Sequence, residues 1–572
     1  MRDKTRRPPI SIFDQVSRHT FIGESEISQP QPVRTGYGAD TPSVVIGTYR
    51  GDTDMGTTLR RDHRSPKPTE APARRAAFGL SLAVAVVAAL IVPFAASARS
   101  IPDGRGFDTA VPFYGQAAVA KPVALQNVPQ NPFMAAGNFS NIHNNSYMTD
   151  TYTQAGPLGK NTSVTSVYAK GECASVTFNS KGQIVAICLL PGKPAYLTLM
   201  QPDTLKVITQ LALPSVPATS KSGRANRIST RDYTELSGGY FFLDNKDRAV
   251  VSTATRHLIT YSVEGSGSKQ KFVAGTDVDL TSAVAEGDVI ESALPDFAGN
   301  IWFVTLNGGK VGYVAHETNA ISVTALPAGE EIANSFAMGK DGGIYVVSTA
   351  AMYRFDKATF PAATWRTTYA NSGVQKPGQK SIGSGTTPTI MPGGRVSIAD
   401  NASPNEHVVV YDTKTGDTVC QVALKPKNRF GTENSLISVG NALIVENNYG
   451  NENVQSATLG RTTTPGMTRI DISKDGTCTT TWRNTTESTP SVVPKFSAAT
   501  GLIYTYTKPK GPGTIDRWYW TAIDFRTGKL VYSVLAGTGI LFNNSYASLY
   551  VGPSGDGYVG VIGGLIRVHD AG

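Results

Sequence analysis

The sequence predicts an all-β protein whose larger part is an eight-bladed β-propeller. Only 17% of the 572 residues are charged, and the chain contains 57 Gly and 34 Pro, which favours short strands joined by many turns. Beyond residue 160, short β-type segments alternate with clusters of Gly, Asn, Asp and Pro, and no amphipathic helix of three turns interrupts them. These segments recur about every 52 residues, as propeller blades do.

The repeats align best where the third strand of each unit ends. An aspartate occupies this point in six units, namely Asp203, Asp356, Asp412, Asp471, Asp524 and Asp570, and Ser262 and His316 occupy it in two divergent units. Eight units of four short strands fit blades around a central channel. A series of immunoglobulin-like sandwiches fits poorly, because each would need about 100 residues.

The last repeat lacks a fourth strand, because only two residues follow Asp570. Its sheet edge would stay exposed unless another segment paired with it. Residues Ser163–Tyr168 lie just before the first blade and have strand character. We expect this segment to complete the last blade and close the ring.

Four regions are expected along the chain: a disordered cytoplasmic tail (1–75), a transmembrane signal-anchor (76–98), an extracytoplasmic stalk or connector (99–160) and the propeller (161–572). The run 76–98 has no charged residue and as a helix would be about 34 Å long, enough to cross a bilayer. Six basic residues lie between Arg60 and Arg75, and few follow the run. The positive-inside rule then places the propeller outside the cell membrane. A signal peptide cleaved after Ala98 is the alternative.

The net charge of +9 is divided between the tail and the rest of the chain. Residues 1–75 contain 13 basic and 9 acidic residues, so the remaining 497 residues carry a small positive charge for their size. No basic stripe or nucleic-acid-binding motif occurs, and we expect no nucleic-acid partner.

The four cysteines all follow the predicted membrane segment, where disulfides form readily. Cys173 and Cys188 would face each other in a hairpin that turns at 179–182. Cys420 and Cys478 would pair by elimination, and two free buried thiols are the alternative for them.

One repeat contains Ala522, Asp524, Thr527, Gly528 and Lys529 in the order Ala-x-Asp-x-x-Thr-Gly-Lys. This order resembles the tryptophan-docking repeat of pyrroloquinoline-quinone dehydrogenase propellers, in which Trp follows.

A second copy of the repeat begins at Asp412 and continues through Thr415 and Gly416. The Trp position holds Tyr532 in one copy and Cys420 in the other. The aspartate and glycine suit a tight turn with positive φ. The resemblance implies the fold over residues 160–572. It does not extend to the quinone cofactor. The family has a disulfide between two adjacent cysteines near the cofactor, and this sequence contains no Cys-Cys dipeptide.

Functional groups are expected at one mouth of the channel, where the innermost strands begin. His143 is the best general-base candidate, because it lies in a segment rich in polar groups. Polar clusters near innermost-strand starts and after two second strands provide the ligand-binding candidates Asn144, Asn145, Glu291, Asn334, Thr387, Asp400, Asn401, Glu433, Asn434, Glu446, Asn447, Asn543 and Asn544. Their oxygens could bind Ca²⁺, hydrogen-bond a sugar, or simply satisfy loop backbone and channel water.

The sequence therefore favours a single-pass membrane protein that presents a binding module for an envelope glycan or a protein partner. The alternative is an enzyme that uses the channel mouth, either a quinoprotein-like dehydrogenase or a calcium-dependent lactonase-type hydrolase. Lactonase propellers are similar in outline to the predicted arrangement of oxygen ligands.

Overall fold

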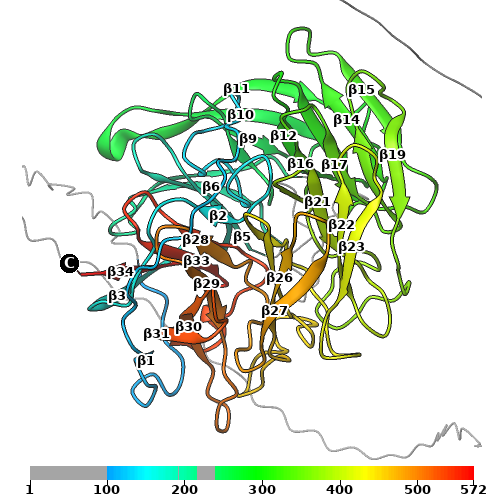
Figure 1. Ribbon diagram of the computed structural model, residues 1–572. Helices are drawn as coiled ribbons and strands as arrows, with labels where there is room; N and C mark the ends of the chain where they lie inside the picture. The colour runs from blue at the N-terminus through cyan, green and yellow to red at the C-terminus, as the bar shows by residue number, and fades with distance from the viewer. Residues whose placement is uncertain (1–98, 191, 216–238, 572) are drawn as a thin grey trace, which may run out of the picture. The chain divides into compact units, whose positions relative to one another are not determined.

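A computed structural model describes residues 99–190, 192–215 and 239–571. The predicted tail and the predicted membrane segment lie outside the described residues. Within the described ranges, no helix has the length and apolar character needed to cross a membrane. The described chain forms eight sheets arranged around a common axis, each with four antiparallel blade strands, which confirms the predicted eight-bladed propeller (Figure 1).

The first four blades follow one another in chain order. Blade 1 contains β4 (Glu172–Phe178), β5 (Ile184–Leu189), β6 (Tyr196–Met200) and β7 (Val207–Ala212). Blade 2 contains β8 (Phe242–Leu243), β9 (Ala249–Ser252), β10 (His257–Glu264) and β11 (Lys271–Asp279), with the 3-10 turn η1 (Gly267–Lys269) between the last two. Blade 3 contains β12 (Ile290–Pro295), β13 (Ile301–Thr305), β14 (Lys310–Val314) and β15 (Ile321–Ala325). Blade 4 contains β16 (Ala337–Met338), β17 (Ile344–Val347), β18 (Ala351–Phe355) and β19 (Ala363–Thr368).

The other four blades complete the ring. Blade 5 contains β20 (Thr389–Met391), β21 (Arg395–Ala399), β22 (His407–Asp412) and β23 (Thr418–Ala423). Blade 6 contains β24 (Ile437–Val439), β25 (Ala442–Glu446), β26 (Met467–Ile472) and β27 (Cys478–Asn484). Blade 7 contains β28 (Lys495–Ser497), β29 (Leu502–Thr507), β30 (Arg517–Asp524) and β31 (Leu530–Thr538), followed by the 3-10 turn η2 (Ile540–Phe542). Blade 8 contains β32 (Leu549–Val551), β33 (Gly557–Val561), β34 (Gly564–Asp570) and β3 (Thr162–Tyr168).

The strand β3 closes the ring. It pairs antiparallel with β34 from Thr162 opposite Asp570 to Tyr168 opposite Gly564 (Figure 1). The carboxylate of Asp570 also accepts hydrogen bonds from Leu158 N at 2.6 Å and Thr162 Oγ1 at 2.8 Å. The predicted closure by the segment before the first blade is therefore confirmed.

Residues 99–160, expected to be a stalk or connector, pack against the blades. The strand β1 (Phe113–Gly115) adds to the outer edge of blade 7 by pairing with β31, and β2 (Thr151–Tyr152) pairs parallel with the inner strand β28. Residues 140–152 lie inside the ring of blades and pass from blade 2 round to blade 7. We call residues 140–152 the channel segment.

The channel segment hydrogen-bonds to the first strands of five blades. Its backbone carbonyls accept from the amides of Leu243, Met338, Ile390, Ser438 and Phe496, which belong to blades 2, 4, 5, 6 and 7. First strands of neighbouring blades also contact one another. These strands therefore border the axis.

The two turns that carry the Asp-x-x-Thr-Gly motif have the local structure that the motif predicts. In blade 7, Asp524 Oδ1 accepts hydrogen bonds from Arg526 N at 3.0 Å and Thr527 N at 2.8 Å, and Gly528 has a φ of +69°. In blade 5, Asp412 caps its turn in the same way, and Gly416 has a φ of +75°.

The docking tryptophans come from the preceding blade. Trp482 on blade 6 packs against Gly528 on blade 7, where a methyl group would lie 2.4 Å from the ring. Its Nε1 donates to the carbonyl oxygen of Phe525 at 2.9 Å. Trp365 on blade 4 packs against Gly416 on blade 5 in the same manner. Each of these aspartate–glycine turns therefore receives a tryptophan ring from the preceding blade, and this contact joins the two blades. We call such a turn a tryptophan socket.

Two other inter-blade contacts replace tryptophan. Cys420 on blade 5 forms a disulfide with Cys478 on blade 6. Tyr532 on blade 7 packs against Gly159, which lies in the segment leading into β3. The other predicted disulfide, Cys173–Cys188, links opposed residues of β4 and β5 within blade 1. Both predicted cysteine pairings are confirmed.

Candidate functional site

A pocket of about 300 Å³ lies on the propeller axis, at the mouth where the innermost strands begin. We call it the axial pocket. Every blade contributes to its wall at or just before its first strand, through Ala174, Tyr240, Glu291, Asn334, Thr387, Glu433, Val493 and Ser545. Further lining residues include Glu331, Lys380, Ser381, Asn434, Ser435 and Tyr546.

The channel segment forms the floor of this pocket. Ile142 and His143 line the axial pocket. A second cavity of about 750 Å³ is lined by alternate residues of the same segment, Asn145, Tyr147, Thr149 and Thr151, by Thr153 just beyond it, and by turns between first and second strands. These turns lie at the opposite ends of the first strands. The segment therefore separates the two mouths of the channel.

A buried ionic group lies within the floor. The Lys495 ammonium donates to the Asp150 carboxylate and to the carbonyl oxygen of Ile142, the latter at 2.5 Å. Asp150 also contacts His143 Nδ1, with its two oxygens at 3.1 and 3.2 Å, and accepts a hydrogen bond from the Ser435 hydroxyl. The side chains of Lys495 and Asp150 are completely buried.

Charge pairing keeps Asp150 ionised in this environment. Burial on its own would raise the pKa of the Asp150 carboxyl, but the positive charge of Lys495 and the contact with His143 hold that pKa below its usual value. Burial lowers the pKa of Lys495, and the charge of Asp150 opposes that shift. Asp150 has a φ of +53°, a conformation that non-glycine residues adopt at an energetic cost and that clusters at functional sites.

The hydrogen-bond pattern determines the tautomer of His143. An ionised carboxylate can only accept hydrogen bonds, so the ring proton lies on Nδ1, which faces Asp150. In the neutral ring the other nitrogen, Nε2, is then an acceptor. Nε2 is buried and has no hydrogen-bond partner among the described residues. Ser435 approaches the same Nδ1 atom at 2.9 Å, so the three side chains do not form a serine-protease triad, which needs the serine at Nε2.

One wall of the axial pocket carries acidic and phenolic groups. Glu433 Oε2 accepts a hydrogen bond from Lys380 N at 2.9 Å, and burial raises the pKa of Glu433 to about 8. Burial, followed by the nearby charges of Glu291 and Glu433, raises the pKa of Tyr240. At neutral pH the Tyr240 hydroxyl therefore keeps its proton and can donate a hydrogen bond.

The structure brings together several of the residues predicted from the sequence. The axial pocket contains six of them: His143, Glu291, Asn334, Thr387, Glu433 and Asn434. All six come from innermost-strand starts or from the channel segment. The other eight predicted residues do not line this pocket.

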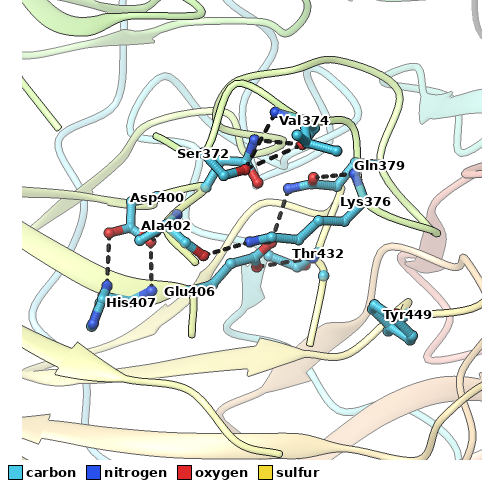
Figure 2. A network of polar contacts seen from close by, with 12 residues as sticks. Ser372, Val374, Lys376, Gln379, Asp400, Ala402, Glu406, His407, Thr432 and Tyr449 are labelled. Atoms are coloured by element: carbon cyan, nitrogen blue, oxygen red, sulfur yellow. Dashed lines mark hydrogen bonds and ion pairs between the residues drawn. The ribbon is translucent and has the colours of Figure 1, made fainter. Parts of the chain in front are cut away.

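Asp400 and Asn401 fix loop structure in blade 5. Asp400 Oδ2 pairs with His407 Nδ1 at 2.8 Å, and its other oxygen accepts from His407 N (Figure 2). Asn401 Nδ2 donates to Asn371 Oδ1 and to two backbone carbonyls. Their hydrogen bonds join loop segments of blades 4 and 5, and neither residue lines the axial pocket.

The same figure shows a second buried network beside these residues. Glu406 is completely buried and contacts Lys376 Nζ at 3.1 Å and Gln379 Nε2 at 2.9 Å (Figure 2). Burial raises the pKa of Glu406 to about 8, and Lys376 counteracts the shift. This network ties the loop before β20 to blade 5.

Glu446 and the neighbouring asparagines hold loops of blades 6 and 8. Glu446 Oε1 accepts hydrogen bonds from the side-chain amides of Asn434 and Asn448. Amide side chains at 447, 543 and 544 donate to backbone carbonyls. The candidates at 144 and 145 face cavities on the other side of the channel segment.

The residues predicted from the sequence do not include Asp150, Lys495, Tyr240 and Lys380, which the structure places in the pocket wall or its floor. Lys495 had a detectable signal, because it is the single charged residue in the stretch 488–499. A buried lysine requires an acidic partner. No sequence signal identifies Asp150 as that partner, since the two residues are 345 positions apart.

Neither a metal site nor a quinone site is identified among the described residues of this pocket. In the described ranges, no three His, Cys, Asp or Glu side chains come together in a way that could hold a metal ion. The four cysteines form Cys173–Cys188 and Cys420–Cys478, so no adjacent-cysteine disulfide borders the pocket.

Comparison with known proteins gives distant similarities. No family model matches the chain. An uncharacterized protein of Archaeoglobus fulgidus is 24% identical over 372 residues, which cover 59% of this chain and 71% of that protein.

Similar solved structures include two enzymes and one protein solved in complex with part of another protein. A europium-containing methanol dehydrogenase is 11% identical, with a TM-score of 0.45, over 77% of this chain and 98% of that one. A streptogramin B lyase is 10% identical, with a TM-score of 0.38, over 72% and 98%. Chaetomium thermophilum Sqt1, solved with the N-terminus of ribosomal protein L10, is 13% identical, with a TM-score of 0.43, over 68% and 94%.

The resemblance to quinoprotein dehydrogenase propellers holds at the level of the fold. The eight-blade count and the tryptophan sockets for Trp365 and Trp482 define that resemblance. The class that fold and site together define is a divergent eight-bladed propeller with a polar axial pocket whose floor is a channel segment.

Proposed function

We propose that the protein is a membrane-anchored, extracytoplasmic module that binds a glycan of the cell envelope in its axial pocket. The observation that carries the proposal is the convergence of all eight blades and the channel segment on one polar pocket. Mixed hydroxyl, amide and carboxyl groups there match a ligand that both donates and accepts hydrogen bonds.

The composition of the pocket wall supports a sugar as the ligand. The rings of Tyr240 and Tyr546 provide apolar surface beside the polar groups, and saccharides have both kinds of surface. A volume of about 300 Å³ lies at the lower end for small-molecule pockets, which suits a terminal sugar rather than a long chain. A protein partner at the pocket rim is the alternative.

Calorimetric titration of the full-length protein in detergent with neutral mono- and disaccharides tests the proposal. Thr387→Val keeps the side-chain shape, removes one pocket hydroxyl and should weaken binding by about fivefold, because one hydrogen bond contributes about 1 kcal/mol. Thr153→Val alters the opposite cavity and is the matched control. Equal effects of both substitutions, or no saccharide binding, would contradict the proposed glycan site.

Membrane anchoring rests on the uncharged run 76–98 and the basic residues before it. We expect the full-length protein to fractionate with membranes and its propeller to be digested by protease added to intact cells. Retention of residues 1–75 in the mature product supports an anchor, whereas their loss supports a cleaved signal peptide.

A further inference from the structure

The floor of the axial pocket contains a base that saccharide binding alone does not require. In the neutral ring of His143, Nε2 is an acceptor without a donor, because Nδ1 carries the proton that faces Asp150. A buried acceptor without a donor costs about 1–3 kcal/mol. Buried acceptors without a donor are found at sites where a side chain takes a proton from a bound molecule.

A hydrogen-bond donor lies next to this base. The rings of Tyr240 and His143 have centroids 6.2 Å apart, and both residues line the axial pocket. Because Tyr240 keeps its proton at neutral pH, its hydroxyl can donate to an oxygen that becomes negatively charged during a reaction. His143 and Tyr240 therefore border the same small volume.

We propose that the axial pocket hydrolyses carboxylic esters of polyhydroxylated compounds, such as sugar lactones and O-acylated sugars, with His143 as the general base and Tyr240 as the oxyanion donor. The choice of a polyhydroxylated substrate rests on the proposed glycan function.

The reaction balances with water as the only co-reactant. His143 Nε2 takes a proton from water while the water oxygen forms a bond to the ester carbonyl carbon, and the carbonyl oxygen becomes an oxyanion that Tyr240 hydrogen-bonds. The oxyanion then re-forms the carbonyl, the bond to the leaving alkoxide oxygen breaks, and the proton on Nε2 passes to that oxygen. The products are a carboxylic acid and an alcohol, and the acid ionises in water.

The experiment follows ester hydrolysis by the full-length protein in detergent, with glucono-δ-lactone and an O-acetylated monosaccharide as substrates. His143→Gln should lower the rate at least about 100-fold, the usual contribution of a general base. Tyr240→Phe keeps the ring and should lower the rate by about 100- to 1,000-fold. Added imidazole should restore part of the activity to His143→Ala.

His257→Gln is the matched control. His257 Nδ1 also pairs with an aspartate, Asp277, at 2.7 Å, but on blade 2 and outside the pocket. This variant should hydrolyse both substrates at the wild-type rate.

Two outcomes would overturn the hydrolase: wild-type protein that cleaves neither substrate, or a His143→Gln variant that cleaves at the wild-type rate. Titration of a non-hydrolysable monosaccharide in parallel distinguishes this failure from failure of the glycan site. Saccharide binding without hydrolysis removes the hydrolase and keeps the glycan proposal, and absence of both removes both.

Discussion

Lys495 Nζ contacts the Asp150 carboxylate, and neither side chain is exposed to solvent. The two residues come from the innermost strand of blade 7 and from the channel segment. The contact therefore joins a blade to the floor of the axial pocket and requires both charges to be present.

Removal of one of these charges should destabilise the protein strongly. Lys495→Met leaves an unpaired buried carboxylate and is expected to lower the free energy of unfolding by about 3–5 kcal/mol, measured by urea denaturation. The double variant Lys495→Met/Asp150→Leu should recover much of that loss. Exposed Lys529→Met is the control and should change stability by less than about 0.5 kcal/mol. A double variant as unstable as the single one would argue against charge pairing.

Gly528→Ala should destabilise the protein more than Gly440→Ala. Both glycines have positive φ, at +69° and +59°, so alanine strains the backbone at each. Only at 528 would the methyl group also clash with Trp482, whereas nothing lies within 4 Å at 440. We expect a difference of about 1–3 kcal/mol in thermal or urea denaturation. Equal losses would mean that the tryptophan socket contributes little to blade packing.

Asp570→Ala should loosen the closure of the ring. The substitution removes acceptors for Leu158 N and Thr162 Oγ1, and charge-assisted hydrogen bonds contribute about 1.5–3 kcal/mol each. Amide exchange in β3 should become at least about tenfold faster, as measured by hydrogen–deuterium exchange. Asp203→Ala is the control, because Asp203 Oδ1 bonds within its own exposed turn. Unchanged exchange in β3 would show that strand pairing alone holds the closure.

Glu446→Gln should stabilise the protein at alkaline pH. Burial raises the pKa of Glu446 from 4.5 to about 8. The folded state therefore retains a proton that the unfolded state loses, so this contribution to stability is complete below pH 4.5 and is lost as pH rises through 8.

Glutamine removes this pH dependence and keeps the acceptor for Asn434 Nδ2. We expect a higher melting temperature than wild type at pH 8.5 and a small difference at pH 5, by calorimetry. The control is Glu264→Gln, at an exposed position of β10, which should leave both melting temperatures unchanged. A Glu446→Gln variant that is less stable at pH 8.5 would contradict an unfavourable buried carboxylate.

Most of the fold could be predicted because the repeat is local. The turn aspartates at the ends of third strands, the 52-residue spacing and the strand-like Ser163–Tyr168 are all contained in short stretches of sequence. The tryptophan sockets could not be predicted, because each tryptophan docks on the next blade. Within the two repeats that contain the motif, the position of the motif's tryptophan holds Tyr532 or Cys420.

The site could be predicted only in part for a similar reason. Starts of innermost strands can be counted from the sequence, and this placed Glu291, Asn334, Thr387 and Glu433 at the mouth. The same rule could not separate pocket groups from loop-fixing groups such as Asp400, because that distinction depends on hydrogen-bond partners. Asp150 was missed because two of its three side-chain partners, Ser435 and Lys495, come from blades 6 and 7.

The channel segment has a consequence for how the molecule is made. Its residues precede every blade in the chain, yet they hydrogen-bond to the innermost strands of five blades. The blades must therefore assemble around a segment that is synthesised before them. The strand β3 is also synthesised before the blades, and it can pair only after β34 has been synthesised. Contacts between such distant positions slow folding. We expect the pocket floor and the ring closure to form together, as the last step of folding.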